Sequence, residues 1–152
     1  MKRLSRILLV VCMLWMATAS AIAQNRIFEK YKKMDNVEYI CIGRAMLKMM
    51  SLADMGVNVS GSTNAIHRVL IIHSEENEPA ARMVKDFEQL RDDEAYEMLL
   101  YVKSDDECVT TLLSAQGKEK ELIMYIDSED EKTFIVITGN LTDEVIESIL
   151  SK

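Results

Sequence analysis

Proline and glycine are scarce in this sequence, which has one proline and five glycines among 152 residues. The isolated glycines form neither a G-x-G-x-x-G fingerprint nor a P-loop, so the motifs that cradle nucleotide phosphates are missing. No G-x-S-x-G motif marks a serine nucleophile. Low-complexity runs and internal repeats are also absent. The sequence therefore predicts one compact folded unit, no cofactor and no catalytic residue, and we expect a protein that is not an enzyme.

Basic residues are concentrated at the start of the chain. The first six residues hold three cations, an unbroken apolar stretch follows at 7–17, and small residues lead to Ala21-Ile22-Ala23. This order is that of a secretory signal peptide, and its apolar run is about half of the roughly 20 residues that a membrane-spanning helix needs. We predict cleavage after Ala23 and a periplasmic or secreted product that does not span the membrane.

Cys12 offers an alternative to simple cleavage. With the residues before it, it resembles a lipidation motif, which would tether the protein to a membrane. Val11 is bulkier than the residue that normally precedes a lipidated cysteine, and the apolar run before Cys12 is short. We favour cleavage, and lipidation at Cys12 stays open.

Cationic patches are missing from the remainder of the chain. Residues 24–152 number 129 and carry 15 basic against 25 acidic side chains, a net charge of −10. Nucleic acids and anionic lipids both require basic surfaces. We therefore expect no nucleic-acid partner, and the length fits a single domain, residues 24–152, with a sizeable core.

Cysteine is rare, and only Cys41 and Cys108 follow the predicted signal peptide. An exported protein meets oxidising conditions that permit a disulfide. A bridge also requires two Cα atoms within about 7 Å, which spacing alone does not show. Two free cysteines that act as small hydrophobic side chains are the alternative.

The first half of the chain alternates between helical and extended patterns. Residues 25–33 have helical spacing, 37–42 favour a strand, 44–54 a helix, and 66–73 a strand with an apolar centre. The next helix has Asn77 as a potential cap and Pro79 in its first turn. Its apolar face would consist of Ala80, Met83, Val84, Phe87 and Leu90.

The second half is predicted to contain consecutive strands. Four strand-like runs lie at 96–103, 107–114, 120–127 and 132–138, and short polar segments connect them. Connections of that length join antiparallel neighbours, because parallel strands need a crossover. A last helix should begin near Thr142, with Thr142 as its cap and Leu141 packed against Ile146.

These elements predict an α+β fold with a largely antiparallel sheet of about six strands. The sheet includes a C-terminal four-strand meander, and the helices pack mainly on one face. We expect Glu97, Lys103 and Glu121 on the outer, solvated face of the meander.

Methionines are unusually numerous, and three of them gather in the predicted helix at 44–54. Met46, Met49 and Met50 have the spacing of one helical face. We interpret them as a packing face, because methionine commonly fills irregular cores. The alternative is a small-ligand or copper site, since thioether sulfur prefers monovalent copper.

Other metal ligands are sparse. His67 and His73 are the only histidines, and roughly 20 Å of extended strand would separate them, so they cannot share an ion. Glu75 and Glu76 lie near His73, but a metal site usually requires three or four ligands. The acidic segments 105–107 and 127–131 fit solvated hairpin tips rather than calcium loops. We therefore predict no metal site.

Several segments together resemble one known family. They are the runs VEYICIGRAML, HRVLIIHSEEN, YEMLLYVKSDDECV and KEKELIMYIDSEDEKTFIVITGNLTDEVIESI, which begin at 37, 67, 96 and 118. Their order, with Tyr96 to Leu99, Glu121-Leu122 and Gly139-Asn140-Leu141 as landmarks, is similar to that of the domain of unknown function 4252 (DUF4252) family. The resemblance implies a secreted protein of Gram-negative Bacteroidetes, placed in the periplasm or cell envelope. It implies no established activity and no catalytic residue.

An exported chain with a full core and no chemical motif suggests a binding role. We expect a non-enzymatic cell-envelope protein that acts as a protein-interaction or regulatory accessory module, with an envelope protein as its partner. The alternative function is binding of a small ligand or copper through Met46, Met49 and Met50.

Overall fold

The computed structural model describes residues 27–49, 64–114 and 117–151. The predicted signal peptide and Met50 lie outside these ranges. The chain divides into two compact units, Met1–Met34 and Asp35–Lys152. In the first unit, a short 3-10 helix η1 (Lys30–Lys33) follows one helical turn, and Phe28 and Tyr31 are buried.

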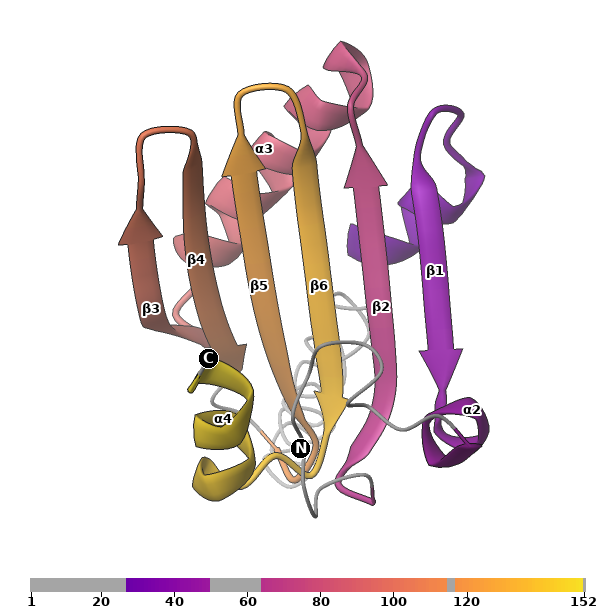
Figure 1. Cartoon of the computed structure of the whole chain (residues 1–152), viewed down its shortest axis with the longest axis vertical. Coiled ribbons are helices and arrows are strands. Elements are labelled where there is room, and N and C mark those ends of the chain that lie inside the picture. The colour runs from indigo at the N-terminus through magenta and orange to yellow at the C-terminus, as the bar shows by residue number, and fades with distance from the viewer. Residues whose placement is uncertain (1–26, 50–63, 115–116, 152) are drawn as a thin grey trace, which may run out of the picture. The chain divides into compact units, whose positions relative to one another are not determined.

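The second unit is built on a six-stranded antiparallel sheet (Figure 1). The strand order is β1-β2-β6-β5-β4-β3, so the four C-terminal strands form the predicted meander and β2 pairs with β6. The α+β prediction is confirmed. Its strands are β1 (Glu38–Gly43), β2 (Ile66–Ser74), β3 (Tyr96–Lys103), β4 (Glu107–Ser114), β5 (Lys120–Ser128) and β6 (Lys132–Gly139).

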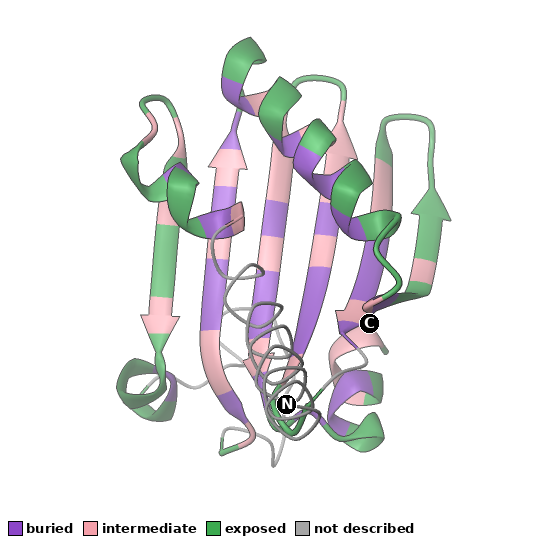
Figure 2. Cartoon of the chain, turned by 180° about the vertical axis from the view of Figure 1, so that it is seen from behind, coloured by how far each residue is buried: buried purple, intermediate pink, exposed green. Residues whose placement is uncertain are grey.

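The long helix α3 (Asn77–Arg91) crosses the upper part of one face of the sheet diagonally (Figure 2). Its buried side chains include Met83, Phe87 and Leu90, which recur at helical spacing as predicted. The ring of Phe87 stacks on Tyr125 of β5 with centroids 4.2 Å apart. Asn77 is already helical, so the predicted cap is wrong by one residue: Glu76 is the N-cap and makes no side-chain capping bond.

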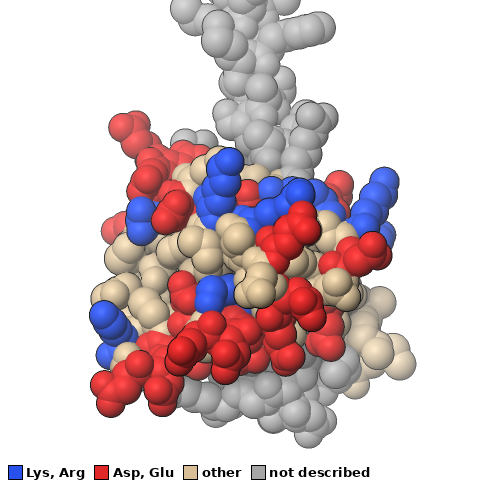
Figure 3. All heavy atoms as spheres, turned by 90° about the horizontal axis from the view of Figure 1, so that it is seen from above, with Lys and Arg blue, Asp and Glu red and all other residues tan. Residues whose placement is uncertain are grey.

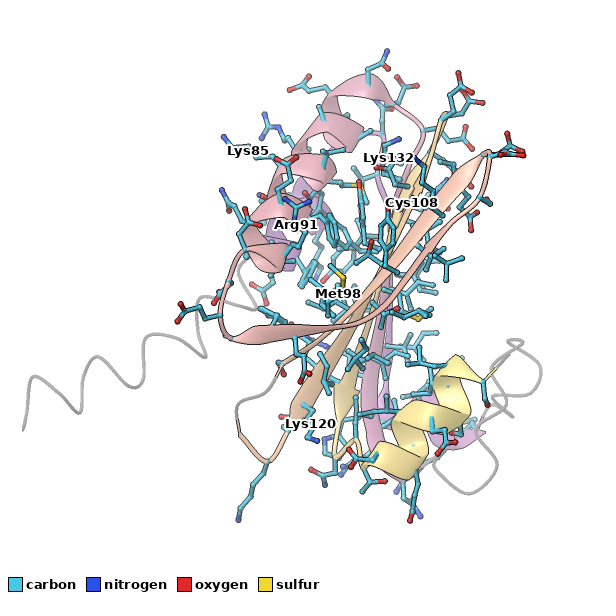
Figure 4. All side chains as sticks on the ribbon, turned by 90° about the vertical axis from the view of Figure 1, so that its left-hand side faces the viewer. Lys85, Arg91, Met98, Cys108, Lys120 and Lys132 are labelled. Carbon is cyan, nitrogen blue, oxygen red and sulfur yellow. The ribbon has the colours of Figure 1, made fainter. Side chains whose placement is uncertain are left out.

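The last helix, α4 (Asp143–Leu150), packs on the opposite face at the other end of the sheet (Figure 4). Thr142 caps it as predicted, because its hydroxyl accepts a hydrogen bond from the Val145 amide at 3.4 Å. Leu141 and Ile146 are buried in the same apolar cluster, as the predicted packing requires. The short helix α2 (Arg44–Met49) contributes Leu47 to that cluster. α2 and α4 therefore pack on the face opposite α3, so the helices of this unit are divided between the two faces rather than gathered mainly on one.

One of the three residues expected on the outer face of the meander is buried. Glu121 is almost fully inaccessible, and the Tyr96 hydroxyl donates a hydrogen bond to its carboxylate at 3.1 Å. Glu97 and Lys103 are exposed as predicted, yet they lie on opposite faces of the sheet. Their cross-strand partners on β4 are Leu113 and Cys108, which point to opposite faces because side chains alternate along a strand. A register shift between Met98 and Leu100 inserts one extra residue and reverses the alternation.

Candidate functional site

The edge strand β3 carries most of the exposed apolar side chains in the described part of the chain. Met98, Leu99, Tyr101 and Val102 are all exposed, and Tyr101 and Val102 retain 57% and 50% of their accessible surface. β3 is the last strand of the sheet, so its outer backbone edge has no neighbouring strand among the described residues. The charged residues Glu97 and Lys103 lie only near the two ends of the strand.

A groove of about 310 Å³ runs beside β3, between that strand, β4 and the C-terminal half of α3. Its apolar wall is formed by Phe87, Met98, Tyr101 and Tyr125. In Figure 4, Met98 and Cys108 lie on the side of the sheet that faces α3. Arg91, Glu88 and Asp127 add charge at the rim, so the groove suits a ligand with an apolar body and a polar end.

Two polar side chains in the groove have distinctive surroundings. The hydroxyl of Tyr125 is buried and has no hydrogen-bond partner in the described part of the protein. Burial raises the pKa of Tyr125 well above its ordinary value, so this hydroxyl stays protonated at neutral pH. The exposed Tyr101 hydroxyl hydrogen bonds with the Cys108 thiol, which raises the pKa of Tyr101. The groove therefore offers an uncommitted donor at its base.

The cysteines are too far apart for the intramolecular disulfide that the sequence left open. Cys41 on β1 and Cys108 on β4 are both free. Strands β2, β6 and β5 separate β1 from β4, and four strand spacings of about 4.8 Å amount to about 19 Å. A bridge needs Cα atoms within about 7 Å. Within one chain, the two thiols are therefore separate.

The prediction that the methionine helix packs inward is wrong for both described residues. Met46 and Met49 retain 53% and 83% of their accessible surface, whereas the buried residue of α2 is Leu47. A six-residue helix beside an edge strand presents one side chain to the core, and Leu47 fills that place among Ile42 and Val69. Met50 lies outside the described residues, so two thioethers are seen to face solvent.

The histidines have separate surroundings. The His67 Nδ1 atom lies 2.8 Å from a carboxylate oxygen of Glu119. The His73 Nδ1 atom lies 2.9 Å from the Thr133 hydroxyl. Neither imidazole is therefore a partner of Cys108, and no thiol–imidazole pair is formed in the described part of the chain.

His73 also meets two carboxylates that the sequence did not bring together. Its Nε2 atom lies 3.7 Å from a Glu75 oxygen and 3.8 Å from a Glu131 oxygen. Glu75 was recognised as a neighbour of His73 in the sequence, but Glu76 does not belong to this group. Glu131 comes from the turn between β5 and β6, and only the β2–β6 pairing places it beside His73.

Acidic side chains gather over the end of the sheet that carries these turns (Figure 3). A second, open hollow of about 370 Å³ lies there between the β3–β4 and β5–β6 turns. Lys132 projects into this region and pairs with Asp127 at 2.9 Å. The predicted solvated hairpin tips at 105–107 and 127–131 are exposed or half-exposed, in agreement with their composition.

The buried carboxyl of Glu121 is the most strongly perturbed acid in the described part of the chain. Desolvation raises the pKa of Glu121, while the hydrogen bond from Tyr96 and the charge of Arg68 oppose that shift. Its backbone amide donates to the Ser114 hydroxyl at 2.9 Å. This cluster is enclosed between strands, so we assign it to the fold rather than to a binding surface.

None of the described helices combines the length and apolar character needed to cross a membrane.

Comparison with known proteins gives one result for the family. The model of a domain of unknown function, DUF4252, matches residues 31–149. No curated protein and no solved structure matches the chain. Because the family match spans well over half of the 152 residues, the chain belongs to the DUF4252 family.

Proposed function

We propose that this protein is an exported, non-enzymatic interaction module of the cell envelope that binds an extended segment of a partner protein along β3. The observation that carries the proposal is the concentration of Met98, Leu99, Tyr101 and Val102 on an edge strand whose outer backbone has no strand beside it in the described part of the chain. Such an edge is a template for strand addition, in which main-chain hydrogen bonds supply affinity.

The groove beside β3 supports specificity in the same mode. Side chains of an added strand alternate between the two faces of a sheet. On one face they would lie next to Tyr101 and the groove under α3, which accepts an apolar or aromatic side chain. On the other face they would lie next to Val102, where no described helix packs on β3 (Figure 1). Side chains at alternate positions of the bound segment therefore meet different surfaces, and this difference gives sequence specificity.

The setting of this function follows from the predicted signal peptide. Cleavage after Ala23 would release the domain into the periplasm or the medium, and the family resemblance favours a Gram-negative Bacteroidetes envelope. The partner is then an envelope or exported protein. A net charge of −10 after cleavage disfavours nucleic acid as the ligand.

The two edge strands provide a matched test. Val102 on β3 and Ile40 on β1 are both apolar and keep 50% and 47% of their surface. A photo-crosslinking residue at position 102 should give one discrete adduct in intact cells, and the same residue at position 40 should not. The purified adduct partner should bind the wild type and Ile40→Lys equally, and Val102→Lys at least tenfold more weakly. Equal binding by the two lysine variants would refute docking on β3.

A second candidate function is binding of monovalent copper by α2. It is favoured by the solvent exposure of Met46 and Met49, which lie three residues apart on one side of the helix. Copper(I) titration of the wild type and of the Met46→Leu, Met49→Leu, Met50→Leu variant would test it. Because leucine keeps the apolar bulk, copper affinity unchanged by these substitutions would eliminate this candidate.

A further inference from the structure

The three groups around the His73 Nε2 atom have the arrangement of metal ligands. Single donor atoms of His73, Glu75 and Glu131 all lie within 4.8 Å of one another. The distances from Nε2 to the two carboxylate oxygens, 3.7 and 3.8 Å, are too long for hydrogen bonds. Donor atoms around a tetrahedral ion at about 2.1 Å are about 3.4 Å apart. Each carboxylate oxygen is therefore within a few tenths of an ångström of ligand spacing from Nε2, and the two carboxylates would have to approach each other by up to about 1.4 Å to hold an ion.

Thr133 holds the His73 imidazole in the orientation that binding such an ion requires. It is the cross-strand partner of His73, and its hydroxyl lies 2.9 Å from Nδ1. This contact engages one ring nitrogen and turns the other toward the two carboxylates. Metal-ligating histidines characteristically use their second nitrogen in this way.

The surroundings of the three ligands add negative charge. Glu38 faces His73 across the β1–β2 pair, on the same face of the sheet. Lys132, the nearest base in sequence to Glu131, is engaged by Asp127 and by the Ser128 carbonyl. Charge-assisted N–H···O contacts are normally about 2.7–2.9 Å long. At 3.7 and 3.8 Å, neither carboxylate oxygen makes such a contact with Nε2, so the three donor atoms are not engaged with one another.

We propose that His73, Glu75 and Glu131 bind a divalent transition-metal ion of the class that Zn²⁺ represents. One imidazole and two carboxylates form a borderline donor set: the nitrogen disfavours Ca²⁺ and Mg²⁺, and the lack of sulfur disfavours monovalent copper. Three protein ligands leave an open coordination position. The ion would also join the end of β2 to the β5–β6 turn, so binding should raise the melting temperature.

The two histidines give a matched pair of variants for the test. Their side chains are almost equally exposed, at 24% for His67 and 23% for His73, and among the described residues His67 pairs with one carboxylate, that of Glu119. In calorimetric titration with ZnCl₂, the wild type and His67→Asn should bind one equivalent with the same affinity. His73→Asn should bind at least tenfold more weakly. Any Zn²⁺ bound by the cysteine thiols or by other acidic side chains contributes equally in all three proteins, so it does not affect the comparison of their affinities.

A second variant separates loss of the ligand from loss of the fold. Glu131→Gln changes a half-exposed turn residue and leaves the contact between His73 and Thr133 in place. We expect the same metal-free melting temperature as the wild type, at least tenfold weaker Zn²⁺ binding, and a smaller rise in melting temperature on adding Zn²⁺. Equal Zn²⁺ affinity of His67→Asn and His73→Asn, or a wild-type Kd weaker than about 1 mM, would overturn the proposal.

Discussion

Alanine at position 139 should strongly destabilise the protein, because Gly139 has no room for a side chain. A Cβ atom there would overlap the carbonyl oxygen of Ala65 and lie 3.0 Å from the Ile66 Cα. The obstructing atoms are backbone, so relief requires strand β2 or β6 to move. That movement would also strain the hydrogen bond that the Asn140 amide donates to the Ala65 carbonyl at 2.8 Å.

The expected cost combines two terms. Overpacking with backbone displacement costs about 1–3 kcal/mol, and loss of one hydrogen bond costs about 1 kcal/mol. Together they give about 2–4 kcal/mol, a large fraction of the about 5–15 kcal/mol that stabilises a typical domain. For a domain of this size the melting temperature should fall by about 8–16 °C.

Gly43 provides the control, because it also ends a strand but a Cβ atom added to it would meet nothing within 4 Å. Gly43→Ala should be neutral or stabilise by about 0.5 kcal/mol through reduced entropy of the unfolded chain. Urea unfolding of both variants, followed by circular dichroism, measures the difference. A Gly139→Ala free energy of unfolding within about 0.5 kcal/mol of the wild type would refute the steric reasoning.

Two further predictions concern the buried acid and the methionine helix. Because burial raises the folded-state pKa of Glu121, the folded protein holds this proton longer than the unfolded chain does. Wild-type stability relative to Glu121→Gln should therefore decrease as pH rises from about 4.3, the unfolded value, through the folded pKa, and then level off. Urea unfolding at a series of pH values checks this; wild-type stability that increases relative to the variant over that range would contradict it. Leu47→Ala should cost about 2–5 kcal/mol, because Leu47 is fully buried, whereas Met49→Ala should change stability by less than about 0.5 kcal/mol. A larger loss from Met49→Ala in thermal unfolding would show that the methionine packs inward.

Local sequence signals predicted the elements of this fold well. Alternating apolar residues and short polar connections located β3 to β6 within one residue at each end. Thr142 was recognisable as a cap, since a side-chain oxygen before an apolar helix satisfies free amides wherever the helix lies. Such signals depend on near neighbours in the chain and so survive without knowledge of the tertiary structure.

The failures arose where distant residues decide the outcome. In α2, the spacing of Met46 and Met49 fits a packing face, but the surrounding core selected Leu47. The extra residue at Leu99 in β3 changes which side chains lie on the same face of the sheet, and no local sequence pattern predicts it. Glu121 looked like a surface residue because its partner, Tyr96, comes from a strand two places away in the sheet.

The candidate sites were less predictable than the fold. Glu131 was interpreted as part of a solvated turn, and only the pairing of β2 with β6 brings that turn to His73. The sequence of β3 shows its apolar residues but not its position at the edge of the sheet. Strand order therefore decides whether the same residues form a core or a docking surface.

Amide hydrogen exchange of the protein with its cross-linked partner segment tests docking on β3 most directly. The outward-facing amides of Leu99–Lys103 should become protected by at least tenfold when the segment binds, because they gain main-chain hydrogen bonds. The amides of β1, on the opposite edge, should be unchanged. Unchanged exchange in β3 with new protection elsewhere on the sheet would contradict the proposed binding mode.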